Sequence, residues 1–378
     1  MSELPSADRR TALKVIAGSG AAALLGSPVA AALDPDEVSD TKWETQVADD
    51  VVGQSGWLGP VDDRTNLDGE WTFPYHFQTD EDPETHIVGC LGTDGDVLWE
   101  NSYSAVYGHA ADREHLYTAD ETGVYAIDRQ SGETMWSVTG DTLKTSVNAL
   151  AVDDGTLFVD TEGRLWALDT ATGEPMWNTG PRCANEMDEV GQMAVTDTAV
   201  VTPVQTELRA YDRATGEELW TFDEAEYVMA LDGHKETVYV GHRDWITAFD
   251  ATTGEQRWEN NDAYVETIAT NDYGVVVGRT IDIEGDLYEG FSHDGTKQWR
   301  AADDYYELTA PAVQSPDSET SVAGGTEDGV LLHIDQETGE LVNTSAPDES
   351  HPLDRHVRHG DNGHYATSSD GYVFRFVH

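Results

Sequence analysis

The 378-residue sequence contains only two cysteines, Cys90 and Cys183, which lie far apart in the chain. A single pair excludes a disulfide framework of the kind that holds small secreted domains together. The two residues could form one bridge if the fold brought their Cα atoms within about 7 Å. Because an isolated cysteine usually behaves as a small apolar side chain, we expect two buried free thiols.

Basic residues are also scarce. The chain has five lysines, and lysine and arginine together number 21 against 73 aspartates and glutamates, so the formal net charge is -52. Binding to nucleic-acid phosphates needs clustered basic side chains, which excludes nucleic acid as a partner. With 38% hydrophobic residues the chain can still form a core. This composition resembles the acidic, lysine-poor surface of exported proteins of halophiles, haloarchaea in particular, because molar salt screens such self-repulsion.

Long apolar runs are missing. The run Val15–Leu25 is too short to span a bilayer. It follows the basic residues Arg9 and Arg10 and precedes a stretch of small residues, which predicts an export signal peptide at residues 1–32 and a mature chain without a transmembrane domain. The paired arginines resemble a twin-arginine (Tat) signal, which implies a secreted protein or one at the extracellular face of the membrane; Ala12 stands where that motif usually has phenylalanine. A disordered tail is the alternative.

One element is repeated through the rest of the chain. A small residue and an apolar residue are followed by Asp, three turn residues, Gly-Glu, two further residues and Trp. A weaker copy, 333–343, keeps the turn and replaces the Trp, and two shortened copies, 90–99 and 290–299, have Asp-Gly at the turn. In the four complete copies the small residue, Asp, Gly and Trp are Ala126, Asp128, Gly132 and Trp136; Ala167, Asp169, Gly173 and Trp177; Ala210, Asp212, Gly216 and Trp220; and Ala248, Asp250, Gly254 and Trp258.

This element predicts a β-hairpin. The residues before the turn alternate between apolar and other types, and those after it form a second short strand. The Asp side chain can accept backbone N–H bonds two residues on, and the Gly can adopt a positive φ. In the shortened copies, Asp-Gly predicts a tight two-residue turn. A Trp at so regular a position favours a packing role, because its ring must be buried and its N–H needs an acceptor.

The repeat spacing predicts the architecture. The element returns about every 40 residues, with room for four strands in each interval, which is typical of a β-propeller. Segments such as 147–152 and 156–159 supply the additional strands. The last unit ends with its third strand at 372–376, and 41–44 reads as the end of a unit without a beginning. We therefore predict one all-β domain, residues 33–378, which is an eight-bladed β-propeller of four-stranded antiparallel blades closed by the N-terminal strand, since closure removes open sheet edges.

The Ala-x-Asp-x-x-x-Gly-x-x-x-Trp pattern resembles the tryptophan-docking motif of quinoprotein-type propellers, also called pyrroloquinoline-quinone (PQQ) repeats. The resemblance covers about residues 40–378. In that family the Trp of one blade packs against the small residue and the Gly peptide of its neighbour. Some members are PQQ-dependent alcohol or glucose dehydrogenases, whereas others, such as the propeller lipoprotein of the bacterial outer-membrane assembly machine, have the fold and bind no quinone. The small-residue role falls here to Ala126, Ala167, Ala210 and Ala248.

No catalytic motif stands out. The sequence lacks the adjacent Cys-Cys pair of the quinoprotein alcohol dehydrogenases, and it has no Gly-rich phosphate loop, nucleophile elbow or His-Glu-x-x-His motif. These features favour an exported, non-catalytic monomer that binds a protein partner, as a scaffold or in envelope protein assembly, without a cofactor. Loops 182–189 and 224–227 are the expected contact sites, with Arg182 the first to test. The alternative is a dehydrogenase that uses PQQ and calcium to oxidise an alcohol or a sugar.

Two clusters have side chains of metal-ligating types. Imidazoles suit transition metals and carboxylates suit calcium. The histidines lack the tight paired spacing of metal sites, and a carboxylate cluster arises by chance in so acidic a chain, so we expect neither to be a metal site. The clusters are His351, His356, His359 and His364, and Asp62, Asp63, Asn66, Asp68 and Glu70.

Overall fold

The structure is a computed structural model. The predicted signal peptide with Arg9 and Arg10, the cluster at 62–70, and loop 182–189 with Cys183 lie outside the residues it describes. Within the described residues, no helix has the length and apolar character needed to cross a membrane. The described residues are 41–47, 57–58, 72–79, 85–139, 143, 147–161, 163–180, 192–204, 206–223, 225, 228–242, 245–261, 265, 267–279, 287–302, 313–314, 321–325, 331–345, 353–360, 363–368 and 370–376.

The described regular structure is entirely β, in four-stranded antiparallel sheets, as predicted. Seven of the sheets in the described residues consist of four strands that are consecutive in the sequence. They are β2–β5 (Trp57–Leu58, Thr72–Thr79, Thr85–Gly92, Val97–Tyr103), β6–β9 (Gly108–Ala111, His115–Ala119, Gly123–Asp128, Thr134–Thr139), β10–β13 (Val147–Asp153, Thr156–Thr161, Leu165–Asp169, Pro175–Asn178), β14–β17 (Ala194–Val195, Ala199–Val204, Glu207–Asp212, Glu218–Phe222), β18–β21 (Val228–His234, Thr237–His242, Ile246–Asp250, Gln256–Asn260), β22–β25 (Thr267–Asn271, Gly274–Arg279, Leu287–Phe291, Lys297–Ala302) and β26–β29 (Val313–Gln314, Ser321–Gly325, Leu331–Asp335, Leu341–Ser345).

The remaining sheet joins the two ends of the described chain in the order β1-β32-β31-β30, with β1 (Thr41–Gln46), β30 (Leu353–Gly360), β31 (Gly363–Ser368) and β32 (Tyr372–Phe376). Strand β1 runs antiparallel to β32, with Glu44 opposite Phe374. The Val47 N–H donates to Gly371 O at 2.9 Å. The N-terminal strand therefore supplies the fourth strand of a sheet whose other three strands come from the C-terminus.

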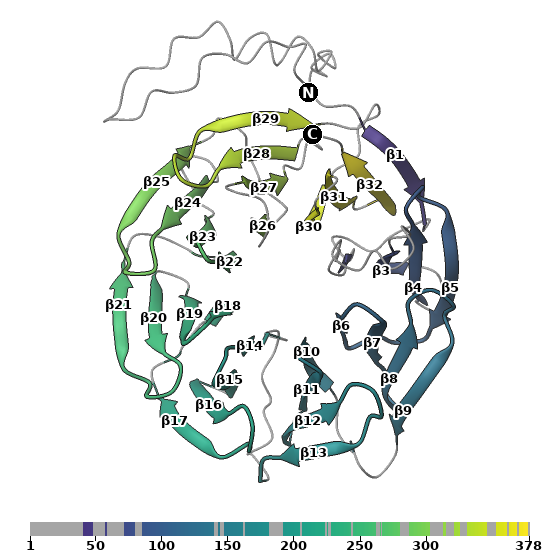
Figure 1. Cartoon of the computed structure of the whole chain (residues 1–378), viewed down its shortest axis with the longest axis horizontal. Coiled ribbons are helices and arrows are strands. Elements are labelled where there is room, and N and C mark those ends of the chain that lie inside the picture. Colours follow the sequence, from purple (N-terminus) through teal and green to yellow (C-terminus); the bar gives the residue numbers. More distant parts are fainter. Residues whose placement is uncertain are drawn as a thin grey trace, which may run out of the picture.

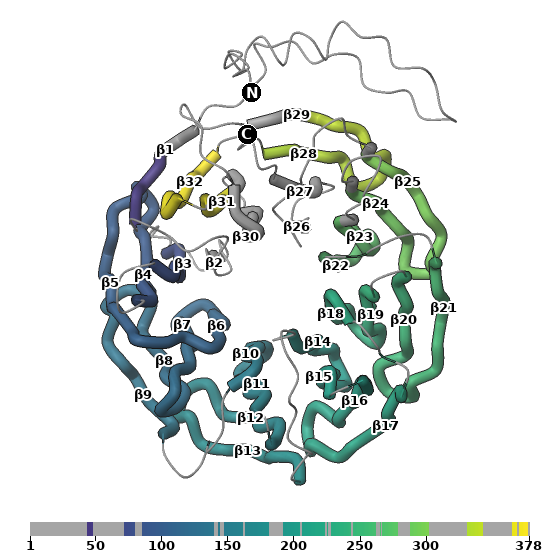
Figure 2. The backbone as a smooth tube through the Cα atoms, turned by 180° about the vertical axis from the view of Figure 1, so that it is seen from behind, coloured from purple at the N-terminus to yellow at the C-terminus, as the bar shows by residue number. Residues whose placement is uncertain are grey.

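The sheets stand side by side around a common centre (Figure 1). The first strand of each consecutive set, such as β10 or β18, lies toward the centre, and the last, such as β13 or β21, lies at the periphery, as the view from behind also shows (Figure 2). Contacts between sheets involve their inner strands, for example β6 with β10 and β18 with β22. The repeated hairpins therefore form the outer rim.

Apolar clusters fill the space between neighbouring sheets. One cluster combines Leu208 and Ala210 of one sheet with Val238 and Phe249 of the next, and Trp220 packs against it. Another combines Tyr117 and Ala126 with Leu157 and Leu168, with Trp136 packed against it. The sheet β14–β17 shows the result: it packs against β10–β13 on one face and β18–β21 on the other, and its middle strands are largely buried.

The turn of the complete repeat is held as its sequence predicts. Asp128 Oδ1 accepts the backbone N–H groups of Gln130 at 3.1 Å and Ser131 at 2.7 Å. Gly132 has a φ of 74°, a conformation that glycine adopts without steric cost. In another copy of the turn, the Arg257 side chain on the following strand donates a hydrogen bond to Asp250. This bond outweighs the opposing effect of burial and lowers the pKa of Asp250 to about 2.

The shortened turns differ from the prediction. The backbone N–H of Gly95 donates to Gly92 O at 3.0 Å, and that of Gly92 donates to Asp96 O at 2.9 Å. Thr93 and Asp94 therefore occupy the centre of the turn, and Gly95, with a φ of 83°, is the positive-φ residue after it. The Asp-Gly pair is thus not a two-residue hairpin turn, because the chain uses a longer loop in which Gly follows the turn. The 290–299 copy has the same hydrogen bonds.

Candidate functional site

The repeat tryptophans dock onto the turn of the next sheet. The indole N–H of Trp136 donates to Thr170 O at 2.7 Å. The ring also faces the turn glycine, because a Cβ on Gly173 would lie 2.7 Å from Trp136 Cε3. The other copies pair Trp99 with Arg129 O and Gly132, Trp177 with Arg213 O and Gly216, Trp220 with Ala251 O and Gly254, Trp258 with His293 O and Gly295, and Trp299 with Gln336 O and Gly339.

The small residue of the motif has a different partner from the one that the resemblance implied. In the Cα register Ala126 lies opposite Trp136 of its own hairpin. At the equivalent position Gly290 lies opposite Trp299, and a Cβ there would lie 2.2 Å from Trp299 Cε2. The small residue thus makes room for its own tryptophan, and the glycine belongs to the neighbouring hairpin. Ala167, Ala210 and Ala248 are likewise opposite Trp177, Trp220 and Trp258.

We predict that Gly216→Ala destabilises the protein more than Gly155→Ala does. Both glycines have a positive φ, 72° and 75°. A Cβ on Gly216 would lie 2.4 Å from Trp177 Cε3, whereas the nearest neighbour of a Cβ on Gly155 is Thr170 Oγ1 at 3.9 Å. Backbone strain alone costs about 1–2 kcal/mol, and displacement of the indole should bring the Gly216 variant to about 3 kcal/mol. Urea unfolding in molar salt measures both values, and equal losses would contradict tryptophan docking.

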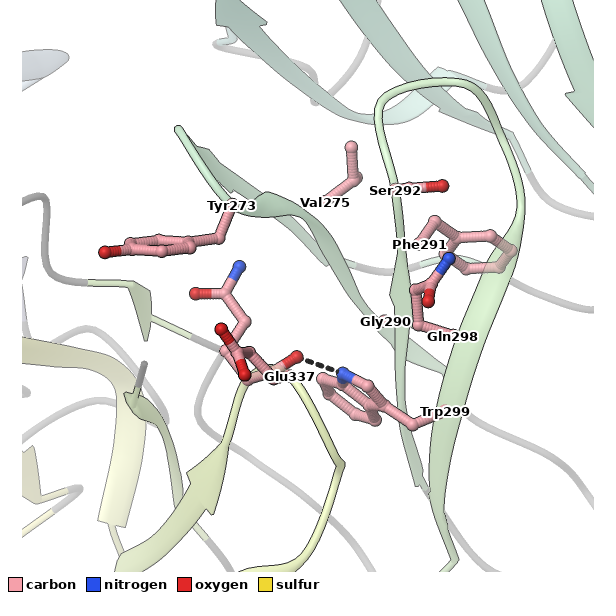
Figure 3. Close-up of a pocket in the computed structure, with 9 residues that line it drawn as sticks. Tyr273, Val275, Gly290, Phe291, Ser292, Gln298, Trp299 and Glu337 are labelled. Carbon is pink, nitrogen blue, oxygen red and sulfur yellow. Dashed lines mark hydrogen bonds between the residues drawn. The ribbon is translucent and has the colours of Figure 1, made fainter. Parts of the chain in front are cut away.

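A pocket of about 370 Å³ lies between the sheet β22–β25 and the sheet β26–β29. Figure 3 shows Tyr273 and Glu337 on one side of it, with Phe291 and Gln298 on the other. Trp299 contributes an apolar wall, and its indole N–H is directed to Gln336 O. The full lining is Tyr273, Val275, Gly290, Phe291, Ser292, Gln298, Trp299, Gln336 and Glu337.

The turn between β22 and β23 fixes one wall of this pocket. The Asn271 and Gln336 side-chain amides exchange hydrogen bonds of 2.9 and 3.0 Å. Asn271 Oδ1 also accepts the backbone N–H of Tyr273 at 2.8 Å. The next residue, Asp272, lies 3.2 Å from His234 Nε2 of the preceding sheet. One turn is thereby tied to both neighbouring sheets, which holds the Tyr273 backbone in a defined position.

A histidine pair lies in a different part of the structure. His76 on β3 is buried, and its Nε2 is 3.0 Å from His86 Nδ1 on β4, so one ring donates an N–H to the other. The rings are nearly parallel, at 4°, and His109 on β6 lies 5.1 Å from His76 between ring centroids. Burial, and then the like charge of His86, lowers the pKa of His76 to about 3. His76 is therefore neutral at ordinary pH.

The lowered pKa of His76 predicts a loss of stability in acid. The unfolded chain, with a histidine pKa near 6.5, binds a proton that the folded chain does not bind until about pH 3. This contribution to the unfolding free energy is therefore complete above pH 6.5 and declines as the pH falls toward 3. Between pH 6.5 and 4.5 the loss should reach about 2 kcal/mol, because the slope rises to its full 1.36 kcal/mol per pH unit only below the unfolded pKa. The slope of the unfolding free energy against pH, measured by urea unfolding, should flatten in His76→Gln. An unchanged slope would assign the pH dependence to other groups.

The structure describes the remaining predicted site residues only in part. Cys90 is buried with a free thiol, and burial raises its pKa to about 11. His356 and His359 lie on β30, and the Cα register places His359 opposite His364; His351 lies outside the described residues. In the described part of the chain, no three His, Cys, Asp or Glu side chains form a group that could hold a metal ion. Neither the pocket nor the His76–His86 pair has a local sequence signal that could have predicted it.

A model of a known protein family matches nearly the whole chain. The sequence model for "Outer membrane protein assembly factor BamB" matches residues 2–138, 84–205, 138–232 and 204–375. The chain belongs to this family. The matches overlap one another along the chain, as expected for a sequence built of repeated units. No curated protein sequence matches the chain.

Solved structures support the β-propeller fold of this BamB-family chain. BamB from Moraxella catarrhalis is 19% identical, with a TM-score of 0.60 over 89% of this chain and 100% of that one. The computationally designed Ika8 protein is 17% identical, with a TM-score of 0.65 over 88% and 100%. The Neurospora crassa Pan2 WD40 domain is 11% identical, with a TM-score of 0.54 over 72% and 88%. At these identities the similarity shows the fold alone.

Two observations bear on the alternative of PQQ with calcium in this BamB-family chain. The sequence has no adjacent cysteine pair, and Cys90 lies buried opposite Trp99 in a packed sheet. The described part also offers no set of three carboxylates or imidazoles that could hold a calcium ion beside a quinone.

Proposed function

We propose that this chain is an exported, non-catalytic scaffold of a halophile that binds a protein partner at the cell surface, in protein interaction or envelope protein assembly. The observation that carries the proposal is the family match to an outer membrane protein assembly factor across nearly the whole chain. The quoted structural relative has the same fold at full length. A propeller offers a rigid frame with loops at its two faces, which suits partner binding.

We further propose that the sheets are the blades of an eight-bladed ring closed by β1. The pairing of β1 with β32 supports closure. So does Val47, which packs in one cluster with Phe73 of the sheet β2–β5 and Tyr365 of the sheet that joins the two chain ends. A ring with paired ends leaves no long open sheet edge for aggregation. The two arginines of the predicted twin-arginine signal, Arg9 and Arg10, fit export of a protein that has already folded.

Affinity capture in the source organism tests the function. Tagged protein, cross-linked in intact cells in molar salt, should be recovered outside the cytoplasm with one envelope protein in near-stoichiometric amount. Untagged protein in excess should compete for that partner. Recovery without a competable partner would contradict the scaffold function.

A reconstitution experiment distinguishes the scaffold function from the alternative of a quinoprotein dehydrogenase. The protein is incubated with PQQ and calcium in molar salt, and quinone absorbance and dye-linked oxidation of alcohols and sugars are measured. We expect no stoichiometric quinone binding and no turnover. Stoichiometric binding with turnover would replace the scaffold function with a quinoprotein activity.

A further inference from the structure

The polar groups of the pocket in Figure 3 are unequally available to a ligand. The Trp299 N–H donates to Gln336 O, and the Gln336 amide is paired with Asn271. The Ser292 hydroxyl donates to Asp294 Oδ1. Glu337 is exposed and has its carboxylate at the pocket, and Tyr273 is 47% exposed. A ligand therefore meets one carboxylate and one aromatic ring above an apolar floor.

The walls and the charge of the pocket favour an organic cation. Val275, Phe291 and Trp299 are 1%, 2% and 5% exposed, so the floor is apolar and packed. Glu337 is the one charged residue of the lining. The nearby Lys297 is paired with a residue outside the lining, because its ammonium nitrogen lies 2.9 Å from Oε1 of Glu289. With Glu337 as its charge and no basic residue in the lining, the site repels phosphates and carboxylates at contact distance and attracts a positive group.

Arginine matches this combination better than lysine does. Its aliphatic stem can cover an apolar floor while its head stays near solvent. Its planar guanidinium can stack on an aromatic ring such as Tyr273 and donate two N–H bonds to a carboxylate such as that of Glu337. An ammonium is more strongly hydrated and has no such plane. Stacking on Tyr273 would shield a guanidinium paired with Glu337 from solvent, and a shielded pair is screened less by salt than an exposed one.

We propose that this pocket receives an arginine side chain of the partner protein, which rests on the proposed scaffold function. The site would recognise an exposed arginine on the surface of that partner. Tyr273 and Glu337 come from adjacent sheets, so recognition depends on the seam between β22–β25 and β26–β29.

Model ligands test the pocket directly. N-acetyl-arginine methylamide, its lysine analogue and its neutral citrulline analogue are titrated by NMR in molar KCl. The arginine amide should bind about tenfold more tightly than the citrulline amide, and more tightly than the lysine amide. Glu337→Gln should reduce its affinity about tenfold, as expected for the loss of one charge-assisted pair, and Tyr273→Ala should reduce it as well.

The matched control is Glu340→Gln, which removes one charge from the same turn at an exposed residue outside the pocket. It should leave the affinity unchanged, because bulk charge is screened. Equal binding of arginine and citrulline amides, or equal losses in the Glu337 and Glu340 variants, would overturn the proposal.

Partner capture distinguishes failure of the pocket from failure of the scaffold function. If Glu337→Gln loses both the arginine amide and the partner, the proposal is supported. If wild type and Glu337→Gln capture the partner equally, the pocket proposal fails and the scaffold function stands. If the arginine amide binds but wild type captures no partner, the cation selectivity of the pocket stands and its use in a scaffold is overturned.

Discussion

Dialysis from molar KCl into about 10 mM salt should abolish the β-sheet circular dichroism signal of this protein. The formal net charge of -52 repels itself at low ionic strength, where the Debye length is about 30 Å, and is screened at 1 M, where it is about 3 Å. Described ion pairs such as Arg213–Asp153 and Lys235–Asp272 neutralise few of the carboxylates. Many others, such as Asp169, accept backbone N–H groups of their own turn instead.

A neutral osmolyte provides the control for the salt experiment. Sucrose at low salt stabilises compact states by exclusion from the protein surface but does not screen charge. It should restore less structure than KCl. Full retention of the signal in low salt would contradict the halophilic interpretation, and equal rescue by sucrose would contradict charge repulsion as its cause.

Deleting residues 33–46 should lower the melting temperature sharply in molar salt. The deletion removes β1, which pairs with β32 at five positions, and the 2.7 Å hydrogen bond from Thr45 Oγ1 to Gly95 O. At about 1 kcal/mol for each lost backbone hydrogen bond, the loss is on the order of 5 kcal/mol, before any from packing. Such a loss is comparable to the whole stability of many domains.

The control for this deletion removes residues 1–32, the predicted signal peptide. It should leave the melting temperature unchanged, because β1 remains. The 33–46 deletion should also aggregate more readily, since β32 becomes an exposed edge. A melting temperature equal to that of the control would remove the closure proposal.

The sequence alone was sufficient for the parts of the fold that depend on local chemistry. Asp128 and Gly132 occupy the turn as their side chains dictate, and the repeat spacing predicted four strands per unit. The acceptor of each indole N–H was not predictable, because any exposed carbonyl of the neighbouring sheet could have served. In the structure the acceptor for Trp136 is the carbonyl of Thr170, the residue directly after the motif Asp of the neighbouring hairpin.

The candidate site could not be read from the sequence for a related reason. Asn271 and Gln336 are 65 residues apart and pair only because two sheets are neighbours. Tyr273 and Glu337 belong to no sequence motif. They line one pocket because the sheets β22–β25 and β26–β29 pack against each other. The His76–His86 pair spans two strands at diagonal positions, which no periodicity specifies.

The central claim is that the repeated tryptophans build the frame and that partner contacts lie elsewhere. The test measures urea stability and partner capture in molar salt for Trp220→Ala beside Glu337→Gln. Trp220 donates to Ala251 O at 2.8 Å and packs 6.0 Å from Phe249 between ring centroids. Its truncation should cost about 3–5 kcal/mol, with capture retained in the folded fraction, while Glu337→Gln should lose capture at unchanged stability. Loss of the partner in Trp220→Ala with an unmoved unfolding midpoint would contradict the account.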